Sequence, residues 1–186
     1  MTKILVLSVL FVQYLWEQFL QFINIKFITE NIKKYPGALP EILVSEISLE
    51  DYKKAADYSK AKVKFGAFAA AFNFALVVII ILFSLLNIAD KLVEGLPGER
   101  IIFCLIIFFI AQIIGIPFRI YSTFVIEERF GFNKMTAKTF VIDLAKGIVV
   151  SLVLLIPLLG LLFYFYDVTG KYWWAFGFLL FAAFQY

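Results

Sequence analysis

Four long apolar runs constrain the fold of this chain more than any other feature. They cover residues 4–25, 66–89, 101–118 and 147–166. At ~1.5 Å rise per residue each can cross a hydrocarbon core of about 30 Å as a helix, the third with some interfacial extension. Hydrophobic residues fill 63% of the 186 positions, whereas soluble domains are nearer to half apolar. The sequence therefore predicts an all-α, polytopic membrane protein with four full transmembrane helices.

A fifth apolar run covers residues 172–186 and begins with three aromatic residues, Tyr172, Trp173 and Trp174. Such residues anchor helices at the membrane surface. The run is too short to cross the bilayer, and a helix that ended in mid-bilayer would leave backbone carbonyls unpaired in lipid. We therefore expect a truncated fifth helix, and we interpret residues 1–186 as the N-terminal transmembrane region of a longer protein.

The first run, 4–25, could instead be a cleaved signal peptide. It is interrupted by polar residues, among them Gln13, Glu17 and Gln21, and no small-residue cleavage site follows it. We therefore interpret it as a retained helix.

Basic residues predict the orientation in the membrane. The loops 26–65 and 119–146 lie on one side and carry thirteen of the 17 Lys and Arg residues. By the positive-inside rule both loops are cytoplasmic and the N-terminus is outside or lumenal. Ser48 and Asp51 resemble a capping box, which predicts a helix that continues into the second run as a long cytoplasmic extension. Its lysines favour a solvated face near anionic lipid and not a nucleic-acid interface.

Four polar residues form a stripe on the first helix. Gln13, Glu17, Gln21 and Asn24 follow a spacing of four, four and three residues, which places them on one helical face. Polar groups inside an apolar span face other helices or water. Two interpretations remain open: the wall of a polar chamber, which the ionisable Glu17 slightly favours, and a hydrogen-bonded seam between helices.

The sequence contains no catalytic, cofactor-binding or metal-binding constellation. It has no His, which removes the usual neutral-pH base and the commonest zinc ligand. Glu127-Glu128 is reminiscent of the Glu-Glu-x-x-x-Arg motif of glutamate-dependent membrane proteases, but Phe132 stands where the Arg belongs. We therefore predict that this chain is not catalytic alone.

A charged segment, residues 123–136, separates the third and fourth runs. We expect a helix that ends near Phe130, a left-handed cap at Gly131 and a new helix capped by Asn133. On that new helix, Asp143 and Lys146 are spaced as i,i+3 partners. From spacing alone, an ordinary connector between helices remains an alternative.

The residues of this segment resemble those before the fourth helix of the CAAX prenyl protease family, and residues 49–60 resemble the sequence before its second helix. The family consists of integral membrane zinc metallopeptidases that surround a water-filled chamber with seven helices. The matching residues of the motif loop are Glu127, Glu128, Gly131, Phe132, Asn133, Thr136, Asp143 and Lys146.

The resemblance implies that this chain is one part of a zinc metalloendopeptidase. In the family an H-E-x-x-H helix and a more distant Glu bind zinc after the fifth helix, and this chain does not reach that point. We therefore expect the catalytic zinc domain to be absent here and zinc to be bound only by the full-length protein. The expected partners are lipid, the C-terminal catalytic region and a peptide or prenylated-protein substrate.

The resemblance also predicts a location in the endoplasmic reticulum of a eukaryote or the plasma membrane of a bacterium or archaeon. The stripe on the first helix and the motif loop would then help to form the chamber wall and the substrate access. The alternative is a non-enzymatic membrane scaffold or a transporter subunit.

Overall fold

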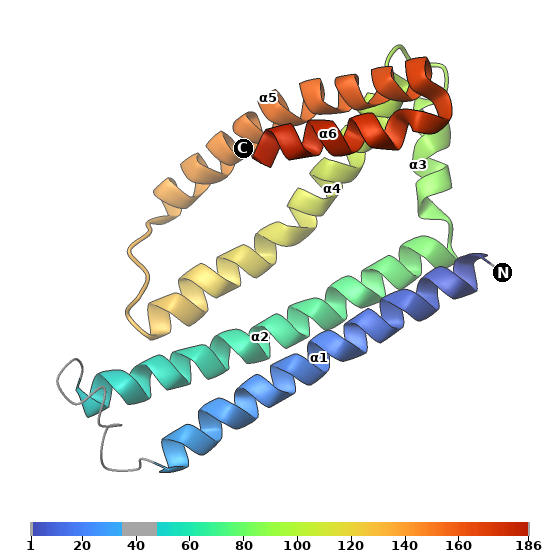
Figure 1. The fold of residues 1–186 in the computed structure, drawn as a ribbon. Coiled ribbons are helices and arrows are strands. Elements are labelled where there is room, and N and C mark those ends of the chain that lie inside the picture. Colours follow the sequence, from blue (N-terminus) through green and yellow to red (C-terminus); the bar gives the residue numbers. More distant parts are fainter. Residues whose placement is uncertain (1, 35–47, 186) are drawn as a thin grey trace. The chain divides into compact units, whose positions relative to one another are not determined.

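A computed structural model describes residues 2–34 and 48–185, and every regular element in these two ranges is helical (Figure 1). The class predicted from the apolar runs is therefore confirmed. Part of the predicted loop 26–65 lies outside the described residues, as does Tyr186. The elements are α1 (Thr2–Lys34), α2 (Leu49–Leu82), α3 (Leu85–Val93), α4 (Glu99–Tyr121), the π-helix η2 (Ser122–Glu127), α5 (Ala137–Thr169), the 3-10 turn η3 (Gly170–Tyr172) and α6 (Trp173–Gln185).

The chain divides into two compact units. The first comprises Met1–Leu92 and Phe108–Lys134, and the second comprises Val93–Ile107 and Met135–Tyr186. The first unit contains α1, α2, η2 and the second half of α4. The second unit contains the start of α4 together with α5, η3 and α6.

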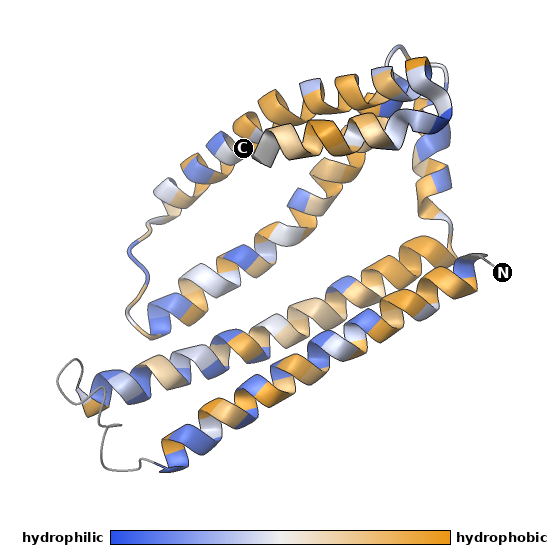
Figure 2. Cartoon of the chain, in the orientation of Figure 1, coloured by the Kyte–Doolittle hydropathy of each residue, from blue (hydrophilic) through white to orange (hydrophobic). Residues whose placement is uncertain are grey.

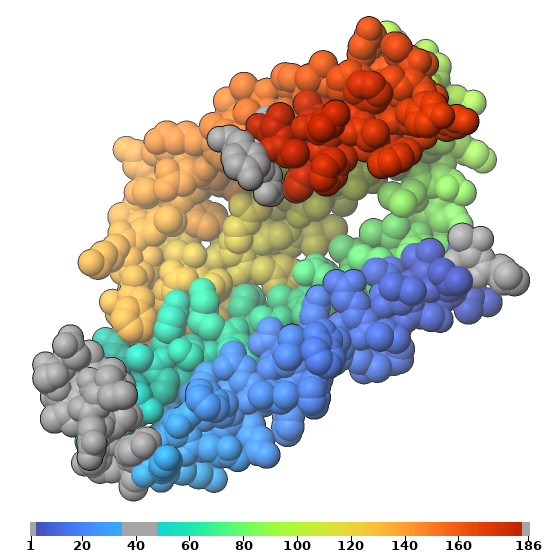
Figure 3. Space-filling model, viewed as in Figure 1, coloured from blue at the N-terminus to red at the C-terminus, as the bar shows by residue number. Residues whose placement is uncertain are grey.

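In the first unit α1 and α2 lie side by side (Figure 1), and their atoms are in contact in the space-filling view (Figure 3). Tyr14 stacks on Phe74 at 4.6 Å between ring centroids. The Gln18 side-chain amide donates to the Ala67 carbonyl at 3.5 Å. Lys3 Nζ donates to Ser84 Oγ at 2.6 Å and joins the start of α1 to the end of α2. The two helices thus form an antiparallel pair with both apolar and polar contacts.

The N-terminus of α2 has the predicted cap. Ser48 Oγ accepts from the Asp51 backbone N–H at 3.0 Å and donates to the Asp51 carboxylate at 2.6 Å. One orphan N–H of the first turn is satisfied in this way. From Leu49 the helix continues without a break to Leu82, so the expected continuity between the charged segment and the apolar run is confirmed.

The apolar run 66–89, by contrast, is not one helix. The helix α2 ends at Leu82, and Ser84 adopts φ 53°, a left-handed conformation that is uncommon for a residue other than Gly. A short helix, α3, then covers the remaining apolar residues. No Gly or Pro marks this position in the sequence. Ser84 Oγ accepts a hydrogen bond from Lys3, 81 residues earlier in the chain, and local sequence does not reveal such a contact.

In the second unit α5 and α6 are antiparallel neighbours joined by η3 (Figure 1). Phe165 stacks on Phe176 at 5.2 Å, and Gly177 lets Leu162 approach closely, since a Cβ at Gly177 would lie 3.3 Å from a Leu162 methyl group. Gly170, at φ 55°, ends α5 and reverses the chain.

Within residues 2–34 and 48–185, four stretches are long and apolar enough to cross a membrane, as predicted: Lys3–Lys34, Leu49–Leu82, Glu99–Glu127 and Ala137–Ala183. The last contains both α5 and α6. The apolar residues fill the C-terminal half of α2 and the part of α5 that follows its charged start (Figure 2), and many remain exposed, such as Val153 at 65% and Phe178 at 68%. Large exposed apolar surfaces mark contact with lipid or with other protein.

Candidate functional site: a lysine-bridged turn and an aromatic groove

Lys62 connects α2 to both ends of η2. Its Nζ donates to Ser122 Oγ at 3.2 Å and to Glu127 Oε1 at 3.0 Å. The Lys62 and Glu127 side chains are 40% and 27% exposed, so this ion pair is only partly screened by solvent. One ammonium group therefore holds the beginning and the end of η2 against α2.

The π-helical geometry of η2 explains how a single lysine reaches both groups. In an α-helix, positions five residues apart differ by about 140° around the axis. Hydrogen bonds from residue i to residue i+5 widen the turn and bring such positions together along one face. Ser122 and Glu127 are five apart, and both face Lys62. Inside this turn Ile126 is among the most buried side chains, at 6% exposure.

A tight turn follows η2. The backbone N–H groups of Gly131 and Phe132 donate to the carbonyls of Glu128 and Glu127, each at 2.9 Å. Gly131 has φ 70°, which confirms the predicted left-handed cap. The Asn133 side-chain amide donates to the Glu128 carboxylate at 2.8 Å and braces the turn.

The predicted role of Asn133 as a helix cap is wrong. The helix α5 begins at Ala137, and the cap is Thr136, whose Oγ1 accepts from the Thr139 backbone N–H at 3.1 Å. Thr136 has the extended backbone that an N-cap requires. Both residue types are good caps, so the sequence alone did not distinguish them.

Aromatic and cationic groups fasten the turn to α2. The Tyr58 ring lies edge-on to Phe132 at 4.8 Å and to Phe130 at 5.6 Å. Lys54 Nζ lies 5.3 Å from the Phe132 ring centroid, and Lys62 Nζ lies 5.7 Å from that of Tyr58. Such contacts stabilise by roughly 0.5–1 kcal/mol each at exposed sites. The motif turn is therefore packed onto α2 and is more than a simple connector.

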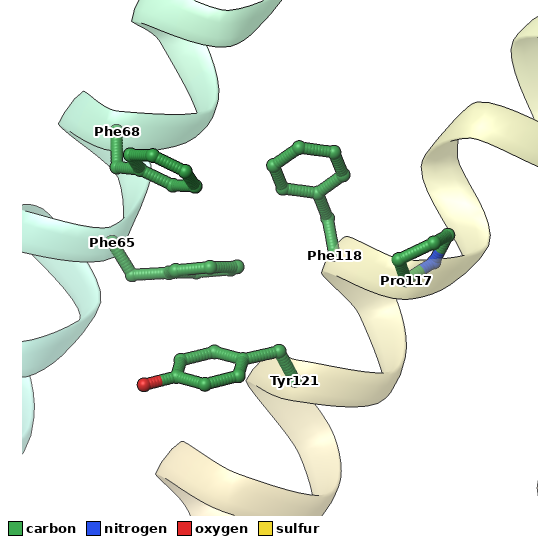
Figure 4. A pocket seen from close by; sticks show the side chains of 5 residues that line it. All are labelled: Phe65, Phe68, Pro117, Phe118 and Tyr121. Atoms are coloured by element: carbon green, nitrogen blue, oxygen red, sulfur yellow. The ribbon is translucent and has the colours of Figure 1, made fainter.

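A cavity of about 460 Å³, here called the aromatic groove, begins one helical turn after Lys62 on α2 (Figure 4). Figure 4 shows the Tyr121 ring below that of Phe65, with its hydroxyl directed toward α2; the two rings stack at 4.8 Å. The volume falls within the range of small-molecule sites. The groove is lined by Phe65, Phe68, Pro117, Phe118 and Tyr121.

The polar stripe of α1 lies beside α2. Gln13 and Glu17 are exposed, are hydrogen-bonded to each other at 3.2 Å, and line a second cavity, of about 360 Å³, together with Gly66 and Asn73. Gln21 is half-buried close to Gly66, and Asn24 is exposed. Gln18, which the predicted stripe did not include, donates a side-chain hydrogen bond across the helix pair to the Ala67 carbonyl.

The remaining residues of the predicted motif belong to the second unit. Thr136 caps α5, while Asp143 and Lys146 are exposed side chains on that helix. Glu128, in the first unit, is exposed and accepts from Asn133. The structure thus brings Glu127, Glu128, Gly131, Phe132 and Asn133 together in one turn.

One ion pair of the second unit could not be predicted from the sequence. Arg100 Nη1 donates to Asp167 Oδ1 at 2.7 Å, and the guanidinium also lies near the rings of Phe163 and Tyr166, at 5.9 and 5.6 Å. The partners are 67 residues apart, so no local spacing relates them. They tie the start of α4 to the end of α5.

The described part of the chain offers no group of zinc ligands. It has no His, and within residues 2–34 and 48–185 no three Asp, Glu or Cys side chains are grouped so that they could hold a metal ion. Zinc prefers a set of three or four His, Cys or carboxylate ligands.

The membrane-length apolar helices of the described residues define the class as a polytopic helical membrane protein. A family model described as the CAAX prenyl protease N-terminal region, with five membrane helices, matches residues 28–186. The chain belongs to the CAAX prenyl protease family.

Individual relatives agree with this assignment. A CAAX prenyl protease 1 homolog of Dictyostelium discoideum is 28% identical over 98% of this chain and 44% of its own length. A probable CAAX prenyl protease 1 of Schizosaccharomyces pombe is 33% identical over 72% of this chain and 31% of its own length. The chain therefore spans less than half the length of these relatives.

The crystal structure of Ste24p from S. mikatae has the same fold in its matching part. The TM-score is 0.83 at 24% sequence identity, and the match covers 98% of this chain and 44% of that one. The likeness therefore supports the helical arrangement.

Proposed function

We propose that this chain is the N-terminal membrane portion of a zinc metalloendopeptidase that resembles the CAAX prenyl proteases, and that it is not catalytic alone. The observation that carries the proposal is the family match over residues 28–186 in a chain whose described residues offer no metal site. Zinc, its ligands and the base that activates water would then come from outside these 186 residues. The substrate would be a peptide or a prenylated protein.

Within such an enzyme the stripe of α1 would form part of the chamber wall. Gln13 and Glu17 support this role because they are exposed in the first unit and line a cavity with Gly66 and Asn73 of α2. An ionisable group in an apolar span is expensive in lipid and is stable where it meets water. Tyr14 and Gln18 contact Phe74 and Ala67 of α2 directly, while Gln13 and Glu17 border the neighbouring cavity.

The motif turn would shape access to the chamber from the cytoplasmic side. Thirteen of the 17 basic residues lie in the loops 26–65 and 119–146, so these loops would be cytoplasmic and the N-terminus outside or lumenal. The α2 segment before Gly66 and the turn at Glu127–Asn133 would then be the cytoplasmic extensions. The membrane would be the endoplasmic reticulum in a eukaryotic cell and the plasma membrane in a bacterium or archaeon.

The test uses the protein purified from its native gene at its native length. Its zinc content is measured by inductively coupled plasma mass spectrometry, and cleavage of a farnesylated C-terminal peptide is measured with and without a chelator. About one zinc per chain and chelator-sensitive cleavage would support the proposal. A zinc-free protein of 21.3 kDa without peptidase activity would overturn it and favour a non-enzymatic scaffold.

A further inference from the structure

We propose that the aromatic groove binds one anionic phospholipid, with an acyl chain against its aromatic rings and the headgroup phosphate at Lys64. The groove is apolar and remains open in the first unit: Phe68 is 62% exposed and Tyr121 is 47% exposed. Figure 4 shows these rings around a common space between α2 and α4. An acyl chain would cover apolar surface that the described residues leave uncovered.

The position of the groove along α2 suits a lipid. Phe65 directly precedes the apolar run that begins at Gly66, and the charged segment of α2 ends at Lys64. The groove therefore begins where the polar part of the helix meets its apolar part. Aromatic side chains favour this interfacial level, where a lipid headgroup and the first part of its acyl chains also lie.

Lys64 supplies a charge at the polar end of the groove. It precedes Phe68 by four residues, so both lie on the same helical face. Because helical side chains lean toward the N-terminus, the ammonium group extends from the groove toward the charged segment. Lys64 is exposed and has no salt-bridge partner among residues 2–34 and 48–185. A phosphate could therefore pair with it directly.

The other nearby cations are already engaged. Lys62 is bound to Ser122 and Glu127, and Lys60 pairs with Asp57 at 3.6 Å. Arg119 donates to the Gln112 side chain. Lys64 is thus the cation that gives the groove charge complementarity to an anionic headgroup, while the Tyr121 hydroxyl offers a hydrogen-bond donor at the groove.

The choice of an anionic lipid follows from this charge. Phosphatidylcholine carries its own ammonium group and gains little from Lys64, whereas phosphatidylserine has a net negative charge. Basic residues near an anionic lipid surface contribute about 1 kcal/mol each, which corresponds to a roughly fivefold preference. Lys64 alone should therefore account for a selectivity of about this size.

The experiment is native mass spectrometry of the native-length protein, incubated with equal amounts of phosphatidylserine and phosphatidylcholine that have identical acyl chains. We expect one retained phosphatidylserine per chain, preferred over phosphatidylcholine. Lys64→Gln should lower this preference about fivefold. The matched control is Lys53→Gln, which removes an exposed lysine from the same helix three turns earlier and should leave the preference unchanged.

A second variant tests the apolar part of the site. Phe68→Ala removes a groove ring that is already 62% exposed, so the fold should persist while retention of both lipids falls. Equal retention of the two lipids by the unaltered protein would overturn the proposal, and so would equal losses in Lys64→Gln and Lys53→Gln. Failure to retain lipid, because another part of the protein fills the groove, would also overturn it. These readouts measure lipid binding and are independent of peptidase activity.

Discussion

Lys62 and Glu127 are 65 residues apart in the chain, and Lys62 Nζ donates to Glu127 Oε1 over 3.0 Å. This contact, together with the bond from Lys62 to Ser122, fixes the π-helix η2 against α2. The motif turn begins at Glu127, so its orientation depends on the same lysine. The hydrogen bonds of Lys62 and the aromatic groove lie next to each other along α2, since Lys62 and Phe65 are separated by one helical turn.

We predict that the Lys62–Glu127 pair contributes measurably to stability. Lys62→Met and Glu127→Gln should each lower the free energy of unfolding by about 1 kcal/mol, because each leaves a half-buried polar partner without its charge-assisted hydrogen bond. In a double-mutant cycle the two losses should not add. Denaturant-induced unfolding of the purified protein measures all three variants.

The control for this cycle is the pair Lys60–Asp57, on the same helix. Its distance is 3.6 Å and Asp57 is 63% exposed, so Lys60→Met and Asp57→Asn should show coupling of only about 0.3–0.5 kcal/mol. Equal coupling in the two pairs would contradict a special role for the bridge to η2.

Any side chain at position 131 should lower the stability of the protein. The φ of 70° at Gly131 is left-handed, and this conformation costs residues with a Cβ about 1–2 kcal/mol. Gly131→Ala should therefore lower the free energy of unfolding by that amount. Gly147→Ala should have the opposite sign, because Gly147 lies inside α5 with no heavy atom near its virtual Cβ, and Ala is the better helix former. The same unfolding assay compares the two, and equal signs would refute the argument.

Thr136 and Asn133 can be distinguished as caps of α5. Thr136→Ala should destabilise the helix start by about 1 kcal/mol and speed amide hydrogen exchange in its first turn, where Thr139 N–H loses its acceptor. Asn133→Ala should affect the preceding turn through Glu128 and leave the Thr139 amide protected. Faster exchange at Thr139 in Asn133→Ala would restore the cap role that the sequence suggested.

The features predicted correctly from the sequence have local or bulk causes. Membrane-length helices follow from the length of the apolar runs, and the caps at Ser48 and Gly131 follow from chemistry within three residues of each position. Such features require no knowledge of the tertiary fold. The assignment of the turn to the family likewise rested on adjacent residues, Glu127 to Asn133.

The features that were missed depend on distant partners. The π-helical turn forms where Lys62 can bridge Ser122 and Glu127, and the break at Ser84 coincides with its contact to Lys3. Gln18 was passed over because it lies off the polar spacing of the stripe, yet it faces Ala67 across the helix pair. Periodicity shows which residues share a face of a helix, but the neighbouring helix determines which face makes the contact.

Substitution of Glu17 tests the proposed chamber. Glu17→Leu removes an exposed carboxylate from an apolar helix, so it should preserve or raise stability. If the residue lines a polar chamber, cleavage of a farnesylated peptide by the native-length protein should fall about tenfold in kcat/KM, equivalent to roughly 1.4 kcal/mol. Peptidase kinetics and thermal unfolding are measured on the same preparation.

Phe19→Leu is the matched control, because Phe19 is 50% exposed and lies about 200° around α1 from Glu17. It should change neither the cleavage rate nor the stability. A Glu17→Leu protein that is destabilised would support the interhelical seam instead, because the loss of a hydrogen bond between helices lowers the stability of the fold. Full activity with full stability would remove Glu17 from both roles.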